Sequence, residues 1–322
     1  MWLSSSSVGR KFIMAVTGAV LVLFVTFHCL MNAIAIAWPV AYNSICMFLG
    51  ANWYALIASA GLAAFIIVHI IYAVMLTVQN RRARGHERYA ISKRPAGVEW
   101  SSQNMLVLGI VILAFLAVHM IQFWAKMQLM EVLGKETVIP ATAGTLFIQE
   151  AFQLVWTPIV YIIGFIALWF HMNHGMWSMF QSVGWDSTIW IPRLKKIACC
   201  WTTVVIALFI AEAIVFTVQA NKQHYLKDEA LRNQYKTMVV PMLEKDFGPA
   251  AVQQLSSMPF EQYEQAIRGQ YRSMQDPQAA AYYSAQDPEA YNGMIEALEQ
   301  QIEFLDFIAP EEIPATANPA NN

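Results

Sequence analysis

Five stretches of the chain are apolar over a length sufficient to cross a membrane as a helix, which takes about 20 residues. They cover approximately residues 12–38, 53–79, 104–127, 152–181 and 196–220. The sequence shows no β-strand alternation of apolar and polar residues and no internal repeat. The pattern therefore predicts an all-α membrane protein in which five transmembrane helices form a bundle.

The pattern changes after residue 220, where the chain becomes polar. Prolines separate three predicted polar helices rich in Gln, Glu and Tyr: 222–247, 259–275 and 287–308. The last residues, 309–322, have a composition typical of disorder. We therefore divide the chain into a membrane domain (1–220), a polar helical extension (221–308) and a disordered tail (309–322). Composition alone leaves open whether the extension caps the membrane domain, binds a partner or acts as a spacer.

Charge supports this division. The whole chain is 57% hydrophobic and 13% charged, with a mean hydropathy of +0.42, whereas a soluble domain averages about 25% charged residues. Residues 1–220 hold 13 Lys and Arg against 7 Asp and Glu, and residues 221–322 hold 7 against 15, a net charge of −8. The extension is therefore expected to face water.

The cysteines argue against several kinds of cofactor site, and the N-terminal segment argues against a signal peptide. None of the four cysteines belongs to a CxxC or CxxCH motif, which excludes covalently attached c-type haem and gives no indication of a zinc or iron–sulfur site. The apolar run after Lys11 is too long for the hydrophobic region of a signal peptide. We expect it to be kept as the first span.

Basic residues predict the orientation of the spans. The N-terminus and the loops after spans two and four together hold 11 Lys and Arg, whereas the loops after spans one and three hold 2. Because positive residues favour the cytoplasmic side of a membrane, the N-terminus is predicted to be cytoplasmic. Five spans then place the extension on the outer side.

The first three spans each contain one interior histidine, His28, His69 and His119, and the fourth contains His171 with His174 one turn later. Since a helix rises about 1.5 Å per residue, His28 and His119 lie roughly 22 to 24 Å from the predicted cytoplasmic end. By the same measure, His69 and His171 lie roughly 15 Å from it. Two histidines at each of two levels predict two stacked b haems, an outer one between His28 and His119 and an inner one between His69 and His171.

Other interpretations of these histidines are weaker but remain open. A span histidine can be a hydrogen-bonded packing residue, although four that match at two levels favour ligation. A bare metal site is disfavoured because no carboxylate or thiolate lies beside them at ligand spacing. His174 competes with His171 as a ligand; it lies one turn nearer the predicted cytoplasmic face, and we interpret it as a polar interface residue.

A glycine precedes each of the four histidines by seven to ten residues: Gly18, Gly61, Gly109 and Gly164. A glycine lets a flat macrocycle approach the helix backbone, so each helix would offer a ligand at one level and a gap at the other. Close packing of helices through small residues explains the same glycines equally well.

Taken together, three features resemble the cytochrome b subunit of succinate dehydrogenase and fumarate reductase, in its five-helix, dihaem form. They are the segment SSSVGRKFIMAVTG, the four span histidines, and the HxxxGxWS element His171–Ser178. The resemblance covers about residues 4–220, and the long extension departs from it. In that family the first and third histidines hold one haem and the second and fourth the other, which matches the pairs derived above. The HxxxG register also favours His171 over His174.

The resemblance implies a non-catalytic electron-transfer subunit of a bacterial inner-membrane oxidoreductase of the tricarboxylic acid cycle. Such a subunit anchors a flavoprotein and an iron–sulfur protein on the cytoplasmic face, and electrons pass between the clusters and a quinone, commonly menaquinone. The whole complex is expected to dimerise. Neither a dinucleotide fingerprint nor a set of cluster cysteines is present, so the succinate site is expected in a partner.

Three further residues are candidates for a site, and two alternative functions remain. Arg10 and Lys11 lie in the family-like segment and are candidates to contact haem propionates or a partner subunit. Glu150, at the outer end of span four, is a candidate proton-handling group at a quinone site. The alternative functions are the cytochrome b subunit of a hydrogenase or formate dehydrogenase, and a haem-free membrane anchor.

Overall fold

The computed structural model describes residues 6–50, 52–84, 99–135 and 137–309, and this part of the chain is helical with no strand. It contains five helices long and apolar enough to cross a membrane, as predicted: α2 (Ser7–Ala37), α4 (Trp53–Arg84), α5 (Trp100–His119), α8 (Trp156–Ser182) and α9 (Trp190–Asn221). A π-helical turn, Met120–Trp124, continues α5. Most helices extend a few residues beyond the predicted apolar stretches, because polar caps and interfacial residues continue the helix.

The first helix shows how the sequence sets a boundary. Ser6 is extended, and its hydroxyl accepts a hydrogen bond from the backbone N–H of Gly9 at 2.9 Å. Serine is a preferred N-cap because its side chain satisfies an amide that has no partner within the helix. Helix α2 therefore begins directly after Ser6.

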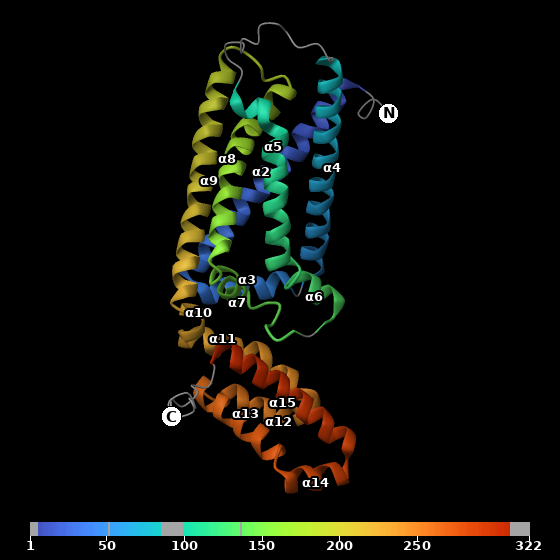
Figure 1. Ribbon diagram of the computed structural model, residues 1–322, viewed down its shortest axis with the longest axis vertical. Helices are drawn as coiled ribbons and strands as arrows, with labels where there is room; N and C mark the ends of the chain where they lie inside the picture. Colours follow the sequence, from blue (N-terminus) through green and yellow to red (C-terminus); the bar gives the residue numbers. More distant parts are fainter. Residues whose placement is uncertain (1–5, 51, 85–98, 136, 310–322) are drawn as a thin grey trace, which may run out of the picture.

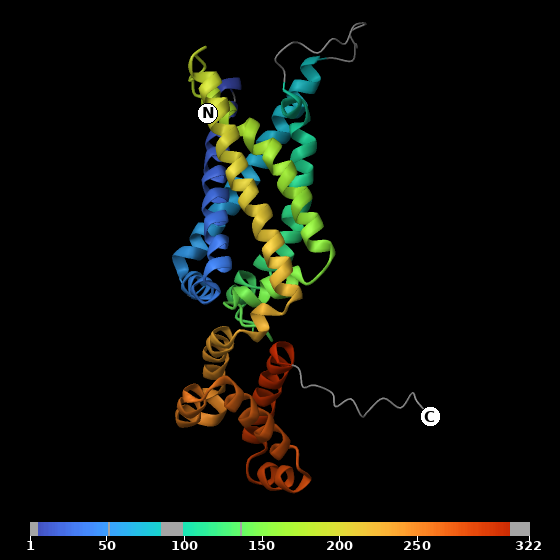
Figure 2. The ribbon, with the colours of Figure 1, turned by 90° about the vertical axis from the view of Figure 1, so that its left-hand side faces the viewer.

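The long helices form one bundle in which α8 is central (Figures 1 and 2). Helix α8 contacts α2, α5 and α9, whereas α4 lies at the edge and packs chiefly against α2. Helix α2 runs obliquely across the bundle in Figure 1. Many of its large apolar side chains are exposed, as are those of the other long helices, with Leu23 at 69% and Val204 at 63%. Such a surface suits a lipid environment.

Three short helices close the end of the bundle nearest the extension: α3 (Pro39–Gly50), α6 (Gln128–Leu133) and α7 (Gly144–Phe152). We call this the extension end, and the opposite end, which holds Arg10 and Arg193, the basic end. Helices α3 and α7 lie across the bundle in Figure 1. A Cβ on Gly144 would lie 2.6 Å from the sulfur of Cys46, so glycine is required where α7 crosses α3. The predicted fourth span, 152–181, corresponds to α8, and α7 is a separate short helix that lies directly before it.

The extension is folded into a compact set of helices. After the short α10 (His224–Lys227) come α11 (Glu229–Val239), α12 (Glu244–Ser257), α13 (Phe260–Met274), α14 (Pro277–Gln286) and α15 (Pro288–Ile308). The predicted helices 259–275 and 287–308 correspond to α13 and α15, whereas 222–247 is broken into shorter pieces. Two Asp-Pro pairs start α14 and α15, with Asp276 and Asp287 as N-caps. The predicted disordered tail, beyond Ala309, lies outside the described residues.

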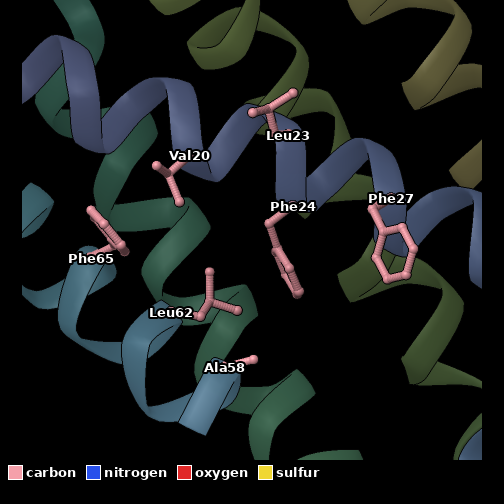
Figure 3. Close-up of a pocket in the computed structure, with 7 residues that line it drawn as sticks. All are labelled: Val20, Leu23, Phe24, Phe27, Ala58, Leu62 and Phe65. Carbon is pink, nitrogen blue, oxygen red and sulfur yellow. The ribbon is translucent and has the colours of Figure 1, made fainter. Parts of the chain in front are cut away.

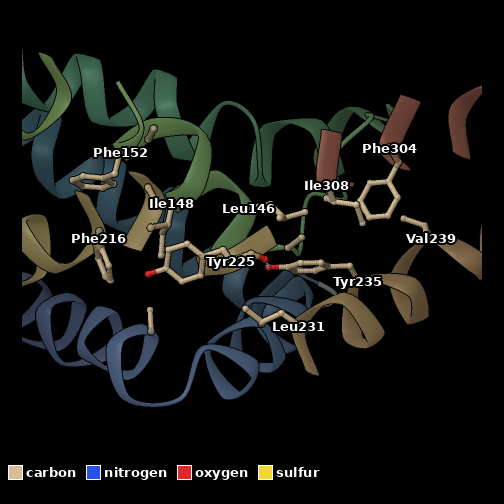
Figure 4. Close-up of a cluster of buried hydrophobic side chains, with 14 of the residues drawn as sticks. Leu146, Ile148, Phe152, Phe216, Tyr225, Leu231, Tyr235, Val239, Phe304 and Ile308 are labelled. Atoms are coloured by element: carbon tan, nitrogen blue, oxygen red, sulfur yellow. Dashed lines mark hydrogen bonds between the residues drawn. The ribbon is translucent and has the colours of Figure 1, made fainter. Parts of the chain in front are cut away.

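Apolar side chains connect the extension to the bundle without a break (Figure 4). Phe152 and Phe216, from the bundle, belong to the same buried cluster as Tyr225 and Tyr235, and the cluster continues to Phe304 on α15. Buried hydrogen bonds join the extension to the bundle as well. Tyr235 on α11 forms a hydrogen bond of 2.8 Å with Thr145 on α7, and Thr145 donates to Asn43 on α3 at 2.9 Å. Of the roles left open by the sequence, the structure therefore shows capping of the extension end.

Candidate cofactor site

The four span histidines meet as two pairs, each between two helices. His28 on α2 faces His119 on α5, with ring centroids 5.7 Å apart and planes at 82°. His69 on α4 faces His171 on α8, with centroids 6.3 Å apart and planes at 61°. We call His28 and His119 the outer pair, since they lie nearer the extension end, and His69 and His171 the inner pair. The partners are the ones that the helical rise predicts.

The separation within each pair is suited to a metal atom between two imidazoles. A metal–imidazole bond is about 2 Å long, and the ring centre lies about 1 Å beyond the nitrogen, so two such ligands stand about 6 Å apart by centroid. Both pairs have this spacing.

A hydrogen-bond chain supports His119. Its Nδ1 lies 3.2 Å from the hydroxyl of Tyr161 on α8, and this hydroxyl donates to Oε1 of Gln122 at 3.0 Å. Gln122 in turn donates to Thr157 at 3.1 Å. The π-helical turn that begins directly after His119 carries Gln122, and wide turns of this kind are common at functional sites.

His69 has an equivalent partner on another helix. Its Nδ1 lies 3.1 Å from the hydroxyl of Thr17 on α2. Thr17 is 3% exposed, and its hydroxyl also lies 2.9 Å from the carbonyl of Ile13, within its own helix. Nothing in the sequence singled out Thr17 or Tyr161. The only available signal was a hydroxyl in the interior of an apolar span.

The other two histidines, His28 and His171, have different surroundings. The ring of Phe24, one turn before His28 on α2, stacks on His28 with centroids 5.4 Å apart. The Nδ1 atom of His171 is buried and finds no hydrogen-bond partner among the described residues. Buried polar atoms in folded proteins nearly always have a hydrogen-bond partner, so this nitrogen is an exception, as are Oε1 of Gln149 and Oγ1 of Thr202.

Two of the four glycines face the inner pair. A Cβ on Gly18 would lie 3.7 Å from Cε1 of His69, and one on Gly109 would lie 3.9 Å from Cε1 of His171. Thus α2 and α5, which supply the outer pair, present glycine at the level of the inner pair. Gly164 instead packs tightly against Phe115, as in ordinary helix contact, whereas the position of a Cβ on Gly61 is open.

An apolar groove runs beside the outer pair, between α2 and α4 (Figure 3). Its volume is about 380 Å³, and its lining is carbon-rich: Val20, Leu23, Phe24, Phe27, Ala58, Leu62 and Phe65. Phe24 belongs both to this lining and to the stack on His28. The groove, whose lining includes the exposed Leu23 and Phe27, therefore lies next to a side chain that contacts the outer pair.

His174 lies in a separate polar cluster at the basic end. Its Nδ1 is 3.1 Å from Glu99, and Nζ of Lys195 is 2.7 Å from the other oxygen of the same carboxylate. Partial burial raises the pKa of Glu99, but the hydrogen bonds and positive charges of Lys195 and His174 outweigh it and hold the pKa below its usual range. The structure thus brings His171, and not His174, opposite His69.

The remaining candidates lie at opposite ends of the bundle. Arg10 and Lys11 lie in the second turn of α2, Arg10 half-buried and Lys11 exposed. Glu150 is on α7, one helix before the expected place, and forms an ion pair of 2.6 Å with Lys126. A further carboxylate, Glu212, is buried in α9 and accepts a hydrogen bond from the thiol of Cys29.

The donor set therefore fits a cofactor held between two imidazoles at each of two levels. Within the described residues, no three potential metal ligands of the types His, Cys, Asp and Glu gather at one place. The histidines gather as pairs with the spacing of two imidazole ligands, one histidine of each pair has a hydrogen-bonded ring nitrogen, and two glycines face the inner pair. A scan against protein-family models and searches of the curated proteins and of the solved structures found no match.

Proposed function

We propose that this chain is the haem b-containing membrane anchor subunit of a succinate:quinone oxidoreductase, of the succinate dehydrogenase and fumarate reductase type. One observation carries the proposal: four histidines from four apolar helices face one another as two pairs at the spacing of two bis-imidazole sites. The N-terminal segment and the HxxxGxWS element favour this family over other membrane cytochromes b.

Each part of the membrane domain then has a task. His28 and His119 would hold an outer haem, His69 and His171 an inner one, and haem held in this way supplies one-electron transfer. The protein's own residues hold the imidazole rings in place, and the apolar helices keep water away from them. Ligation on both sides leaves no position for oxygen, which suits electron transfer.

The two ends of the bundle have different partners in this proposal. The basic end faces the cytoplasm and binds the iron–sulfur subunit, to which the flavoprotein is attached, because basic residues favour the cytoplasmic side. The extension end lies on the outer side of a bacterial inner membrane. The quinone, menaquinone by resemblance, is bound in the membrane domain, and Glu150 remains the candidate proton-handling group.

The experiment is a reduced-minus-oxidised absorption spectrum with haem quantitation, on wild type, His171→Ala and His174→Ala. We expect two b haems per chain in the wild type, one in His171→Ala and two in His174→Ala. The two substitutions remove the same side chain three residues apart, and only His171 faces another span histidine. Absence of haem from the wild type, in cells that make haem, would contradict the proposal and favour a haem-free anchor.

Co-purification distinguishes a succinate dehydrogenase or fumarate reductase complex from a hydrogenase or formate dehydrogenase complex. A flavoprotein that reduces fumarate or oxidises succinate, recovered with the affinity-tagged chain, is the expected result. Recovery of a hydrogenase or formate dehydrogenase subunit with both haems present would keep the histidine scheme and replace the enzyme.

A further inference from the structure

We infer that Thr17 and Tyr161 are positioning residues, each of which fixes the tautomer of one histidine and sets the reduction potential of one haem. The inference rests on the function proposed above. Both side chains are buried inside the bundle, at 3% and 4% exposure, and each belongs to a different helix from the histidine that it contacts.

The argument for Thr17 starts from its single hydroxyl proton. Oγ1 lies 2.9 Å from the carbonyl of Ile13 and 3.1 Å from that of Met14, and a carbonyl can only accept a hydrogen bond. The proton is therefore used within α2. The oxygen is left as an acceptor toward Nδ1 of His69, so Nδ1 carries the ring proton and Nε2 has a free lone pair. That lone pair is the one that binds a metal.

Tyr161 repeats this arrangement at the outer pair. Its hydroxyl proton is donated to Oε1 of Gln122, and Gln122 is held in that orientation by its own donation to Thr157. The phenolic oxygen then accepts from Nδ1 of His119, at 3.2 Å. Each pair thus contains one histidine whose Nδ1–H donates to a buried hydroxyl oxygen.

This hydrogen bond has an electronic consequence. An imidazole that donates from Nδ1 is a more basic ligand at Nε2, and such outer contacts typically change metal affinity by about 10- to 100-fold. A more basic ligand favours the ferric over the ferrous state. Loss of the acceptor is therefore expected to raise the reduction potential of the haem on that side and to leave the other haem unchanged.

The test is a potentiometric titration of the purified complex, with electron paramagnetic resonance of the oxidised haems and haem quantitation. We expect Tyr161→Phe to raise the potential of the outer haem and Thr17→Val that of the inner haem. A tenfold change in the relative affinity for the two oxidation states corresponds to about 59 mV for one electron. The ligand variants His119→Ala and His171→Ala assign each spectral component, since each removes one of them.

Matched controls separate this effect from general damage. Thr217→Val removes a hydroxyl that also bonds to its own helix, at the carbonyl of Ala213, and Tyr42→Phe removes a hydroxyl that donates to Asn32. Within the described part of the chain neither hydroxyl contacts a histidine, so both potentials should stay at the wild-type values. Thr17→Ser keeps the hydroxyl oxygen that accepts from His69, so the potential of the inner haem should equal that of the wild type.

The outcomes are distinguishable. A shift or loss confined to the expected haem supports the inference. Unchanged potentials with both haems retained, a shift of the same haem in both variants, or loss of both haems from either variant would overturn it while the proposed function stands. A wild-type complex without haem would instead overturn the proposed function, and this inference with it.

Discussion

Gly18 on α2 lies directly opposite His69 on α4, where an added Cβ would be 3.7 Å from Cε1 of the imidazole. This distance is ordinary van der Waals contact, so the space beside the ring accepts a methyl group and no more. The same helix supplies His28 to the outer pair. Because Gly18 has no side chain, α2 crosses the level of the inner pair and leaves the space beside His69 open.

We expect Gly18→Leu to displace the ring of His69 and to remove the inner haem, leaving one haem per chain. Gly18→Ala should retain both, because its Cβ meets only a normal contact. Ala63→Leu, at an exposed position of α4, adds a side chain of the same size away from the pairs and serves as the control. Haem quantitation provides the measurement, and two haems in Gly18→Leu would show that this space is not part of the site.

Tyr235 couples the extension to the membrane domain. Its hydroxyl lies 2.8 Å from the hydroxyl of Thr145 and 3.0 Å from the carbonyl of Tyr225, so its one proton is donated to one of these two oxygens, and the side chain is fully buried. Tyr235→Phe removes this hydroxyl from the carbonyl of Tyr225, which costs about 1 to 3 kcal/mol, whereas Thr145 keeps its hydrogen bond to Asn43. We expect faster limited proteolysis of the extension and an unchanged haem content.

Tyr283→Phe is the matched control for this prediction, since Tyr283 on α14 is 43% exposed. It should be cleaved like the wild type. Equal cleavage of Tyr235→Phe and wild type would mean that apolar packing alone holds the extension in place.

Glu150 and Lys126 form an ion pair whose side chains are 33% and 41% exposed, respectively. A pair in such an environment contributes about 0 to 1 kcal/mol, so either partner can be replaced with little loss of stability. If Glu150 handles protons at the quinone site, Glu150→Gln should slow quinone-dependent turnover by at least about 100-fold, as for loss of a general acid or base.

Lys126→Met breaks the same ion pair and keeps the carboxylate. It should therefore retain most of the turnover. Equal activity of Glu150→Gln and wild type, in complexes with the same haem content, would identify Glu150 as a structural surface residue.

The sequence predicts the histidine pairs well because two simple quantities decide them. A fixed rise per residue converts position into height, and the distribution of Arg and Lys gives the direction of each helix. The histidines are then matched by level. Their hydrogen-bond partners, Thr17 and Tyr161, depend on how each helix is rotated and tilted against its neighbours, and hydropathy carries no information about rotation.

Helix α7 was not predicted, and the start of the fourth span was placed at 152 instead of 156, for a similar reason. Leu154, Val155 and Trp156 are as apolar as the helices on either side, so the profile continues through the turn. The tight contact of Gly144 with Cys46, which lets α7 cross α3 closely, depends on tertiary packing that the hydropathy profile does not show. The packing of the extension likewise depends on individual buried side chains, Tyr225 and Tyr235 among them, in a segment whose average composition is polar.

Glu99 gives a pH dependence whose direction follows from its contacts. Lys195 and His174 donate to the carboxylate and lower its pKa from the usual 4.5 in the folded protein. A carboxylate with a lowered folded pKa binds its proton more readily in the unfolded state, so its contribution to stability is present above pH 4.5. That contribution is lost as the pH falls through the folded pKa.

We therefore expect the wild type to unfold at a higher temperature than Glu99→Gln at pH 7, and the difference to shrink as the pH falls below 4.5. The effect should be small, because the Glu99 side chain is 35% exposed and screened by solvent. Glu289→Gln, which removes an exposed carboxylate at the start of α15, controls for the change in net charge. The measurement is thermal unfolding in detergent at pH 7 and at pH 4. A difference between wild type and Glu99→Gln that is the same at pH 7 and pH 4 would show that the carboxylate stays ionised throughout or acts through its shape alone.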